Sequence, residues 1–361
     1  MKPRLAIIID ALPAMGGAEK TLLAALEIYP DAPIYTLVYN PPAFSGTLLA
    51  AHPIETSFIM RLPEALRWYR YYLPLLPLAI QRFDLRGYDR LLSFSYAVAH
   101  GVRSTPGQVH DSYTLTPMRY AWQNAEHPVL KSGVTSLAGR LILRSFRRWD
   151  ASVVQRVDRL ASVSCWTAEN VRRAYQRESV VIYPPVSVER FGRLSPRGDT
   201  YLAVARLVPM KRLERVVEAF NRLKLPLVVV GDGPERQRLE GLAGPTVRIA
   251  GHQSDEALAE WMGRARALVC AAEEDFGIAM VEAQAAGCPV IAYARGGAPE
   301  IVQDGQTGVL FPEPTVESLV QAVQHFECLD REGCFDPQAL QANARRFSKD
   351  RFQRELAEFV G

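Results

Sequence analysis

The sequence predicts an α/β protein with two doubly wound, Rossmann-like domains, each built on a parallel sheet. Short apolar runs rich in β-branched residues alternate with longer helical patterns along almost the whole chain. Near-continuous apolar strands are typical of parallel sheets that helices cover on both faces. The alternation runs through the sequence twice, and 361 residues exceed what one hydrophobic core usually serves. In such folds ligands bind at the carboxyl ends of the strands.

Short apolar segments bounded by turn residues give the expected strands. In the first half they are Leu5–Ile9, Ile34–Val38, Arg90–Phe94, Val109–Tyr113, Leu160–Val163 and Val180–Ile182. In the second half they are Tyr201–Ala205, Leu227–Val230, Val247–Ala250, Ala267–Cys270 and Val290–Ala292. Helices are expected between them, among them Ala18–Ile28, Arg212–Leu223 and Ile278–Ala286.

The domain boundary is expected where two prolines close the last strand of the first half. Pro184 and Pro185 cannot continue a ladder, and the polar stretch Ser195–Asp199 follows before the next apolar strand. We therefore expect a hinge near 184–198, a first domain over residues 1–186 and a second over 187–345.

Composition excludes a disordered or fibrous protein, because 48% of the residues are hydrophobic and 22% are charged. Charge is unevenly distributed. Residues 1–190 hold 22 Lys and Arg against 15 Asp and Glu, whereas residues 191–361 hold 20 against 24. A basic half attracts phosphates on a lipid surface, a lipid-linked substrate or a nucleic acid, although a solvated Arg-rich surface explains it equally well.

The five cysteines are scattered and form no CxxC pair, which favours reduced thiols in a cytoplasmic protein. The apolar run after Met1 ends at Asp10, too early for a signal peptide, and no run approaches the roughly 18 apolar residues of a membrane span. Residues 61–86 interleave five Arg with Trp68 and three Tyr. Such a mixture suits a peripheral position at the inner face of the cytoplasmic membrane, and a helical pair that closes the first core is the alternative.

Two glycines, Gly16 and Gly17, stand between the first strand and the first helix. They permit close backbone approach, and the helix start offers free N–H groups to an anion. Taken alone, a tight strand–helix turn explains them as well. The dinucleotide pattern GxGxxG is missing, and no Walker A sequence occurs.

Two cations, Arg206 and Lys211, stand five residues apart just after a strand in the second half. Arg can hold two phosphate oxygens at once and Lys supplies a mobile point charge, so the spacing suits a diphosphate. A lysine at a helix start opposes the helix dipole, which makes a purely structural role less natural.

A third cluster lies in the segment EEDFGIAMVEA, where Glu274 follows a strand and Glu282 lies in the next helix. Between them Gly277 permits close approach, and the amides of Ile278 and Ala279 are expected to face an anion. Two carboxylates beside such amides can bind sugar and ribose hydroxyls. Further glycine turns at strand ends begin at Gly231 and Gly251, and together they are typical of a nucleotide site.

These segments together resemble the large retaining glycosyltransferase family 4, which has the GT-B fold. The resemblance covers nearly the whole chain and rests on GGAE, YPPV, ARLVPMKR, GDGPE, EEDFGIAMVEAQAAGCPVIA, GGAPEIV and DGQTGVLF. Within that family, HDSYTLTPMRYAW resembles the TPMRY segment of bacterial mannosyltransferases that use GDP-mannose in O-antigen (lipopolysaccharide) or exopolysaccharide assembly.

The resemblance implies a fold in which the two domains face each other across a cleft, with a C-terminal helix over residues 346–361 packing back on the first domain. It also implies that Arg206 and Lys211 bind the donor diphosphate and that Glu274 binds the transferred sugar. Phe276 and Gly277 shape that pocket, Glu282 binds the ribose, and the amides of Ile278 and Ala279 meet phosphate. Gly16 and Gly17 approach the phosphates from the opposite domain, and Gly231 and Gly251 line the donor site.

One departure concerns the acceptor side, for which Glu19, Leu115, Arg119 and Tyr120 are the candidates. The family segment usually carries a histidine where this sequence has Leu115, and leucine cannot hydrogen-bond or move a proton. His110 lies five residues earlier, and compensation by it is the less favoured expectation. Either activity is reduced, the donor pocket is altered, or the chain is an inactivated, sugar-nucleotide-binding or scaffold protein.

The expected activity is front-face hexosyl transfer with retention, from a nucleotide sugar (GDP-mannose as the best guess) to a glycan or a polyprenyl-diphosphate-linked oligosaccharide. Catalysis would be electrostatic, with Arg206 and Lys211 stabilising the leaving diphosphate and Glu274 holding the sugar. No DxD sequence occurs, so neither a metal nor another cofactor is expected, and no nucleic-acid partner is expected. A pyridoxal phosphate-dependent phosphorylase of similar architecture is the remaining, disfavoured enzyme class.

Overall fold

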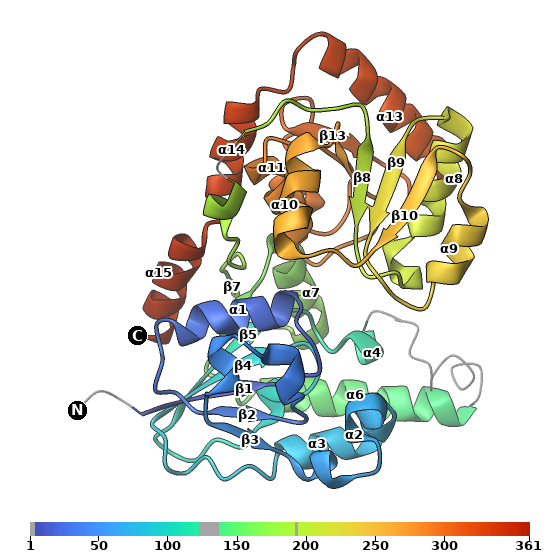
Figure 1. Cartoon of the computed structure of the whole chain (residues 1–361). Helices are drawn as coiled ribbons and strands as arrows, with labels where there is room; N and C mark the ends of the chain where they lie inside the picture. Colours follow the sequence, from blue (N-terminus) through green and yellow to red (C-terminus); the bar gives the residue numbers. More distant parts are fainter. Residues whose placement is uncertain (1–3, 123–136, 192–193) are drawn as a thin grey trace. The chain divides into compact units, whose positions relative to one another are not determined.

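A computed structural model describes residues 4–122, 137–191 and 194–361 of the chain, except for the side chains of Tyr120 and of residues 137–140. The chain forms two compact units (Figure 1). Unit 1 consists of Met1–Tyr183 together with Gln353–Gly361, and unit 2 is Pro184–Phe352. The chain therefore leaves unit 1 at the predicted pair of prolines and returns to it for its last nine residues.

Unit 1 is built on a seven-stranded sheet in which every neighbouring pair is parallel. The strand order is β3-β2-β1-β4-β5-β6-β7, so the order reverses between β1 and β4. The strands are β1 (Leu5–Ile9), β2 (Ile34–Thr36), β3 (Ile54–Thr56), β4 (Arg90–Ser95), β5 (Val109–Thr114), β6 (Arg159–Ser162) and β7 (Val180–Val181).

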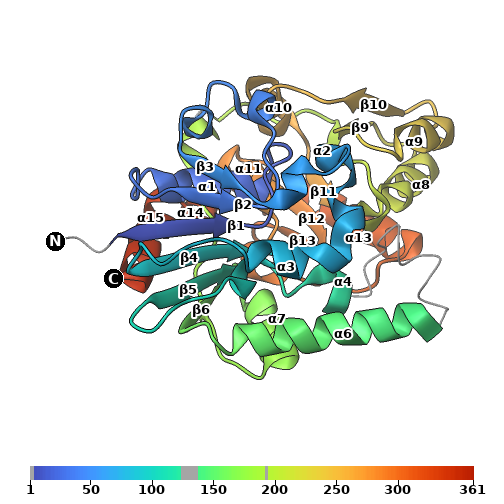
Figure 2. The same ribbon diagram turned by 90° about the horizontal axis from the view of Figure 1, so that it is seen from below.

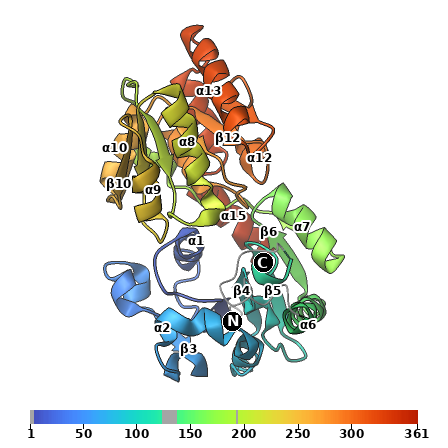
Figure 3. The ribbon, with the colours of Figure 1, turned by 90° about the vertical axis from the view of Figure 1, so that its right-hand side faces the viewer.

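Helices cover both faces of this sheet, as Figures 1 and 3 show. On one face the side chains of Ala6, Ile8 and Leu91 pack with Ile80 and Phe146 in one buried cluster. The α-helices are α1 (Gly17–Leu26), α2 (Ala65–Trp68), α3 (Leu76–Ile80), α4 (Arg119–Trp122), α6 (Leu137–Val154) and α7 (Cys165–Tyr175). The 3-10 turns are η1 (Pro41–Phe44), η2 (Leu48–Ala50), η3 (Phe58–Arg61), η4 (Tyr69–Leu75) and η5 (Ala99–Gly101).

The last helix, α15 (Lys349–Val360), ends within unit 1. Gln353 Nε2 donates to the carbonyl of Ala24 in α1 at 3.0 Å. Arg159 at the start of β6 donates to the carbonyl of Val360 at 3.2 Å and forms a two-armed ion pair with the buried Asp111. The C-terminal residues thus belong to the packing of the first sheet.

Unit 2 repeats the doubly wound plan on six parallel strands in the order β10-β9-β8-β11-β12-β13. Here the order reverses between β8 and β11. The strands are β8 (Tyr201–Val204), β9 (Leu227–Val230), β10 (Val247–Gly251), β11 (Leu268–Cys270), β12 (Val290–Tyr293) and β13 (Gly308–Phe311).

Apolar side chains of the second sheet and of helices α8 and α13 form the largest part of its core. The helices α10, α11 and α14 pack together elsewhere in the unit, and Figure 1 shows them on the other face of the sheet. The α-helices are α8 (Leu213–Leu223), α9 (Arg236–Leu242), α10 (Asp255–Arg264), α11 (Ile278–Ala285), α12 (Ala298–Ile301), α13 (Val316–Arg331) and α14 (Pro337–Arg345), with 3-10 turns η6 (Val188–Phe191) and η7 (Pro209–Lys211).

The structure confirms the two parallel α/β sheets, and it adds an edge strand to each. β3 and β13 were not expected; each is three or four residues long and lies at an edge of its sheet. Residues 58–80 form the short helical elements η3, α2, η4 and α3, with Pro63 between η3 and α2, Pro74 inside η4 and Pro77 in the first turn of α3, and residues 81–86 follow without a helix. No helix among the described residues is long and apolar enough to span a bilayer.

Candidate functional site

The strand order of unit 2 locates the crevice in which a ligand is expected. β8 and β11 are neighbours, and from this pair the chain winds outward in opposite directions. Ligands of open α/β sheets bind at the carboxyl ends of the strands where the order reverses. Arg206 and Lys211 follow β8, and Glu274 follows β11, so the structure brings the loops that carry these candidates to one point.

Lys211 and Glu274 are in direct contact there. Lys211 Nζ donates to Oε1 of Glu274 at 2.5 Å and to Oε2 at 2.6 Å. The lysine side chain is 22% exposed and the glutamate side chain 23% exposed, so the pair is half-buried and remains within reach of a ligand. Arg212, the next residue, adopts a left-handed conformation (φ 52°) that begins α8 and turns its own side chain toward Tyr293. Two residues that lie 63 positions apart therefore form one charged centre.

Arg206 lies on the same loop as Lys211 but is not paired with an acidic side chain in the described part of the chain. Its side chain is exposed, and it forms no hydrogen bond or ion pair with any residue that the structure describes. Leu207, its neighbour, is fully buried and anchors the loop in the core. The Arg206 guanidinium is therefore free to meet an anion at this edge of the sheet.

The amino end of α11 lies beside the ion pair in the sequence, three residues after Glu274. Gly277 precedes the helix with φ 115°, a conformation that favours glycine, and so directs the amides of Ile278 and Ala279 outward from the helix start. Phe276 is buried with its ring 5.4 Å from that of Phe347, which fixes the turn. Glu282 is 7% exposed, one turn into the helix.

Glycines allow the neighbouring loops to approach closely. A Cβ atom at Gly231 would overlap the carbonyl oxygen of Ala205, which follows β8. Gly251, at the end of β10, accepts a hydrogen bond from the amide of Gly231 at 2.9 Å. The loop after β12 supports Glu274 in turn, because the amide of Gly297 donates to the Glu274 carbonyl at 2.8 Å. The backbone of Glu274 is thus fixed before any ligand binds.

Unit 1 carries the remaining candidates on the loops after β1 and β5. Gly16 precedes α1 in an extended conformation, and a Cβ at this position would lie 2.9 Å from Oε2 of the buried Glu19. Leu115 follows β5 directly, and its amide donates to the Ser95 carbonyl at 2.8 Å. Arg119 begins the one-turn helix α4 and is half-buried. The side chain of Tyr120 lies outside the described residues.

His110 does not substitute for the missing histidine. Its ring is buried within the sheet, and Nε2 forms a hydrogen bond with the Ser93 hydroxyl on β4 at 2.9 Å. Burial lowers the pKa of His110 to about 3, so the imidazole is neutral. The side chain stands at the amino end of β5, whereas Leu115 follows the carboxyl end.

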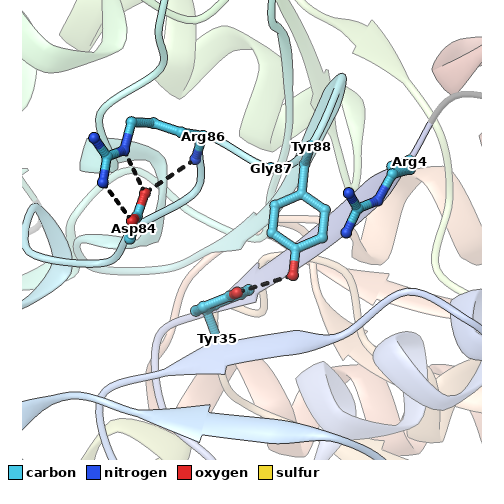
Figure 4. Close-up of a pocket in the computed structure, with 6 residues that line it drawn as sticks. All are labelled: Arg4, Tyr35, Asp84, Arg86, Gly87 and Tyr88. Carbon is cyan, nitrogen blue, oxygen red and sulfur yellow. Dashed lines mark hydrogen bonds and ion pairs between the residues drawn. The ribbon is translucent and has the colours of Figure 1, made fainter.

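An open pocket of about 520 Å³ lies in unit 1 at the amino ends of the strands, opposite the loops that carry the candidates of this unit (Figure 4). Arg4 precedes β1 and Tyr88 precedes β4, so this pocket faces the amino ends of the strands. The Tyr35 and Tyr88 hydroxyls are hydrogen-bonded at 3.0 Å, and Arg86 is paired with Asp84. None of the predicted donor or acceptor residues lines it.

Two aspartates, Asp10 and Asp150, are buried although nothing in the sequence predicted it. Asp10, at the end of β1, accepts hydrogen bonds from four consecutive backbone amides, those of residues 96–99, at 2.5–2.9 Å. Burial raises the pKa of Asp10 although these amides oppose the shift. Asp150 on α6 is likewise fully buried. In sequence, an Asp at a strand end or within an Arg-rich helix is typical of a surface residue, so no signal pointed to these roles.

Among the residues that the structure describes, no group of three or more His, Cys, Asp or Glu side chains could hold a metal ion. Cys270, at the end of β11, has its thiol pKa raised to about 12 by burial and by the charge of Glu274. The described residues therefore offer no activated thiol at this site.

Part of the chain is similar in sequence to known glycosyltransferases. Residues 190–346 match the family of glycosyl transferases group 1. The chain is 30% identical over 196 residues to D-inositol 3-phosphate glycosyltransferase of Streptomyces scabiei, covering 45% of this chain and 44% of the relative. It is 30% identical over 218 residues to the GDP-mannose-dependent alpha-(1-6)-phosphatidylinositol monomannoside mannosyltransferase of Mycobacterium tuberculosis, covering 50% and 56%. The chain thus spans about half the length of these curated relatives.

Solved structures match over both units. HepE of Anabaena, crystallised with UDP and glucose, superposes with a TM-score of 0.69 at 18% identity, covering 99% of this chain and 98% of that one. WaaG, a glycosyltransferase involved in lipopolysaccharide biosynthesis, gives 0.68 at 18% identity, covering 99% of each chain. The fold is therefore the GT-B fold. In sequence, residues 190–346, all of them in unit 2, are similar to the glycosyl transferases group 1.

Proposed function

We propose that the chain transfers a hexose from a nucleoside diphosphate sugar to a glycan or lipid-linked oligosaccharide, with retention of configuration. The observation that carries this proposal is the Lys211–Glu274 pair where the strand order of the second sheet reverses. The loop after β8 also carries Arg206, whose side chain has no partner in the described part of the chain, and α11 begins four residues after Glu274. A diphosphate needs cations and free amides, and a sugar needs a carboxylate that accepts from hydroxyls.

In the proposed donor complex, Arg206, Lys211 and the amides of Ile278 and Ala279 bind the diphosphate. Glu274 accepts from hydroxyls of the sugar and Glu282 from those of the ribose. Gly231, Gly251 and Gly277 leave room for the nucleotide, and Phe276 holds the turn. In unit 1, Gly16, Gly17, Glu19, Leu115, Arg119 and Tyr120 are the proposed substrate contacts.

The proposed reaction breaks the bond between the anomeric carbon and the diphosphate oxygen while the acceptor oxygen attacks from the same face. Negative charge grows on the leaving diphosphate, and Lys211 and Arg206 stabilise it. The departing phosphate oxygen takes the acceptor's proton, so no protein base is required. Lys211 can turn from Glu274 to the diphosphate when a donor binds, because both side chains are only half-buried.

The identity of the donor is the finer part of the proposal. GDP-mannose is favoured by the TPMRY segment and by the name of the mycobacterial relative, whereas HepE was crystallised with UDP and glucose. The experiment is a thermal-shift screen of GDP, UDP, GDP-mannose and UDP-glucose, followed by a transfer assay with and without EDTA. We expect one sugar nucleotide to stabilise the protein and to be consumed equally with EDTA. Binding of bare nucleotides alone, or strong inhibition by EDTA, would contradict the proposal.

A second candidate function is sugar-nucleotide binding without turnover, and Leu115 favours it. The buried His110 leaves this chain without the family's histidine after β5. A Leu115→His variant separates the two functions. If the wild type binds a sugar nucleotide but does not consume it, and Leu115→His does, the chain is the inactivated form; if the wild type already turns over, this alternative is wrong.

We further propose that unit 1 contacts an anionic membrane through an Arg–aromatic patch, defined as Arg67, Trp68, Arg70, Tyr71, Leu75 and Leu78. Its four large apolar side chains are 37–45% exposed, and Arg67 lies over the Trp68 ring. Aromatic rings and arginines together suit the headgroup layer. The patch lies on α2, η4 and α3, and in the view of Figure 2 α3 is drawn between α2 and α6. The helix α6 also exposes Leu141 and Ile142.

Vesicle sedimentation tests this contact. Because each arginine near an anionic surface contributes about 1 kcal/mol, an Arg67→Gln/Arg70→Gln double variant is expected to bind phosphatidylglycerol-containing vesicles about 30-fold more weakly. Leu48→Ser, at a leucine on η2 that is 54% exposed and lies outside the patch, is the control and should bind like the wild type. Equal binding by all three proteins would refute the patch.

A further inference from the structure

The buried carboxylate of Asp150 forms hydrogen bonds with side chains from three separate elements of unit 1. Its Oδ1 accepts from His100 Nε2 on η5 at 2.7 Å. Its Oδ2 accepts from Trp122 Nε1 on α4 at 2.6 Å and from the Tyr175 hydroxyl on α7 at 2.8 Å. Asp150 and His100 are each at most 1% exposed. A carboxylate removed from water needs such donors, and their geometry in turn becomes fixed by it.

The contacts of Asp150 hold both ends of α4. Trp122, the last residue of the helix, is bonded to it directly. The Tyr175 hydroxyl, which donates to Asp150, also accepts from the amide of Met118 just before the helix at 3.3 Å. Arg147, one turn earlier on α6, donates to the Ala121 carbonyl. A helix of four residues is not stable by itself, so its position depends on these bonds.

A second arm of the same network reaches the loop after β4. His100 Nδ1 has no hydrogen-bond partner among the described residues, so the ring is assigned as donating to Asp150 from Nε2. The amide of the preceding residue, Ala99, donates to Asp10 at the end of β1. The loops after β1, β4 and β5 are therefore connected through two buried carboxylates.

We infer that Asp150 is a positioning residue for the acceptor, acting through Tyr175 and Trp122 on the segment 115–122. This inference rests on the proposed function, because that segment carries the acceptor-side candidates Leu115, Arg119 and Tyr120. Asp150 does not touch substrate. It fixes the segment from behind, so that a glycan hydroxyl, rather than water, is held where the anomeric carbon reacts. An error of about 1 Å in such placement can cost about 100-fold in rate.

The partition of the donor between transfer and hydrolysis tests this role. The probe donor is the sugar nucleotide selected by the thermal-shift screen, and octyl mannoside or octyl glucoside is the probe acceptor. Tyr175→Phe keeps the ring and removes the hydroxyl that joins Asp150 to Met118. We expect the ratio of transfer to hydrolysis to fall about 10-fold, with the acceptor KM raised and the nucleoside diphosphate Kd unchanged. Asp150→Asn should act in the same direction.

Tyr113→Phe is the matched control. Tyr113 is also a fully buried tyrosine of unit 1, and its hydroxyl donates to the Ile182 carbonyl at 2.9 Å, away from α4. Tyr113→Phe removes the hydrogen bond to Ile182 and Tyr175→Phe removes those to Asp150 and Met118, so the melting temperature of each variant is measured to separate a general loss of stability. Hydrogen exchange gives a second readout, because Tyr175→Phe should accelerate exchange over 115–122 and Tyr113→Phe should not.

Equal ratios and equal exchange in the two Tyr→Phe variants would overturn the inference and leave the proposed function standing. If the wild type neither transfers nor hydrolyses any of the sugar nucleotides, the proposed function fails, and the acceptor role of Asp150 fails with it. Should Asp150→Asn not fold, Tyr175→Phe still decides the question, since it preserves the volume of the core.

Discussion

The two sheets have the same strand order, but the residues that follow the strands where this order reverses differ between the two units. In unit 1 the crevice between β1 and β4 is filled by the protein's own carboxylate, because Asp10 accepts from four amides of the β4 loop. In unit 2 the loops that follow β8 and β11 carry a half-buried ion pair, and Arg206 on the first of these loops has no side-chain partner among the residues that the structure describes. Consecutive backbone amides can bind an anion, and in unit 1 the Asp10 carboxylate already occupies them. In unit 2 the cationic side chains remain accessible to a ligand.

This difference indicates that the charge of Asp10 stabilises the fold, whereas the charges of Lys211 and Glu274 are available to a ligand. Asp10 is 1% exposed and its partners are backbone groups, so its removal affects folding first. Lys211 and Glu274 are each more than a fifth exposed, and among the described residues their side chains pair with each other. Such a pair costs little to rearrange, since an ion pair near the surface contributes at most about 1 kcal/mol.

The largest effect is expected on catalysis from Lys211→Ala. Removing a group that stabilises developing charge on the leaving diphosphate typically costs about 100- to 1000-fold in kcat. Steady-state transfer assays measure this loss, and the melting temperature is the control. The proposed role of Lys211 is wrong if transfer falls less than twofold.

A large loss of stability is expected from Asp10→Ala. The substitution leaves four amides without their acceptor, and each unsatisfied buried group costs about 1–3 kcal/mol. We expect the free energy of unfolding to fall by at least about 3 kcal/mol, measured by urea denaturation. Nucleoside diphosphate binding by the molecules that remain folded should be unchanged. A weakened Kd with normal stability would instead make the first reversal point a ligand site.

A pH-dependent loss of stability is expected from His110. Its pKa is about 3 when buried in the folded chain and 6.5 when unfolded, so the unfolded chain binds the extra proton below pH 6.5. The stability it contributes is fully present above pH 6.5 and is lost as the pH falls toward 3, at about 1.4 kcal/mol per pH unit. His110→Gln should remove this part of the slope in chemical denaturation at pH 4–6. An identical slope in the variant would show that His110 is not the buried neutral group described here.

The smallest effect on stability is expected from Arg206→Ala. An exposed side chain without partners changes the free energy of unfolding by no more than about 0.5 kcal/mol. Donor binding should nevertheless weaken by about 10-fold, as expected for the loss of a charge-assisted hydrogen bond of about 1.5 kcal/mol or more. Isothermal titration calorimetry with the selected nucleoside diphosphate measures the affinity, and urea denaturation measures the free energy of unfolding. A change in stability without a change in affinity would place Arg206 with the structural charges.

The sequence predicted the sheets because apolar periodicity is a local property, and the strand Leu227–Val230 was predicted to the residue. It also placed Arg206, Lys211 and Glu274 after strands that prove to be neighbours. Their pairing could not be foreseen, since it depends on strand order and on the backbone of Arg212, which are set by tertiary packing. Asp10 and Asp150 were missed for the same reason. Nothing in the sequence around an aspartate reveals which distant amides or side chains will surround it.

The return of the chain to its first unit has a practical consequence for dissection of the molecule. A polypeptide that ends at Tyr183 lacks Gln353–Gly361, and with them the bonds to Ala24 and Arg159. The second unit, by contrast, is a continuous stretch of chain. Separate production is therefore simpler for Pro184–Phe352, whereas the other half requires a short linker that reattaches its terminal nonapeptide.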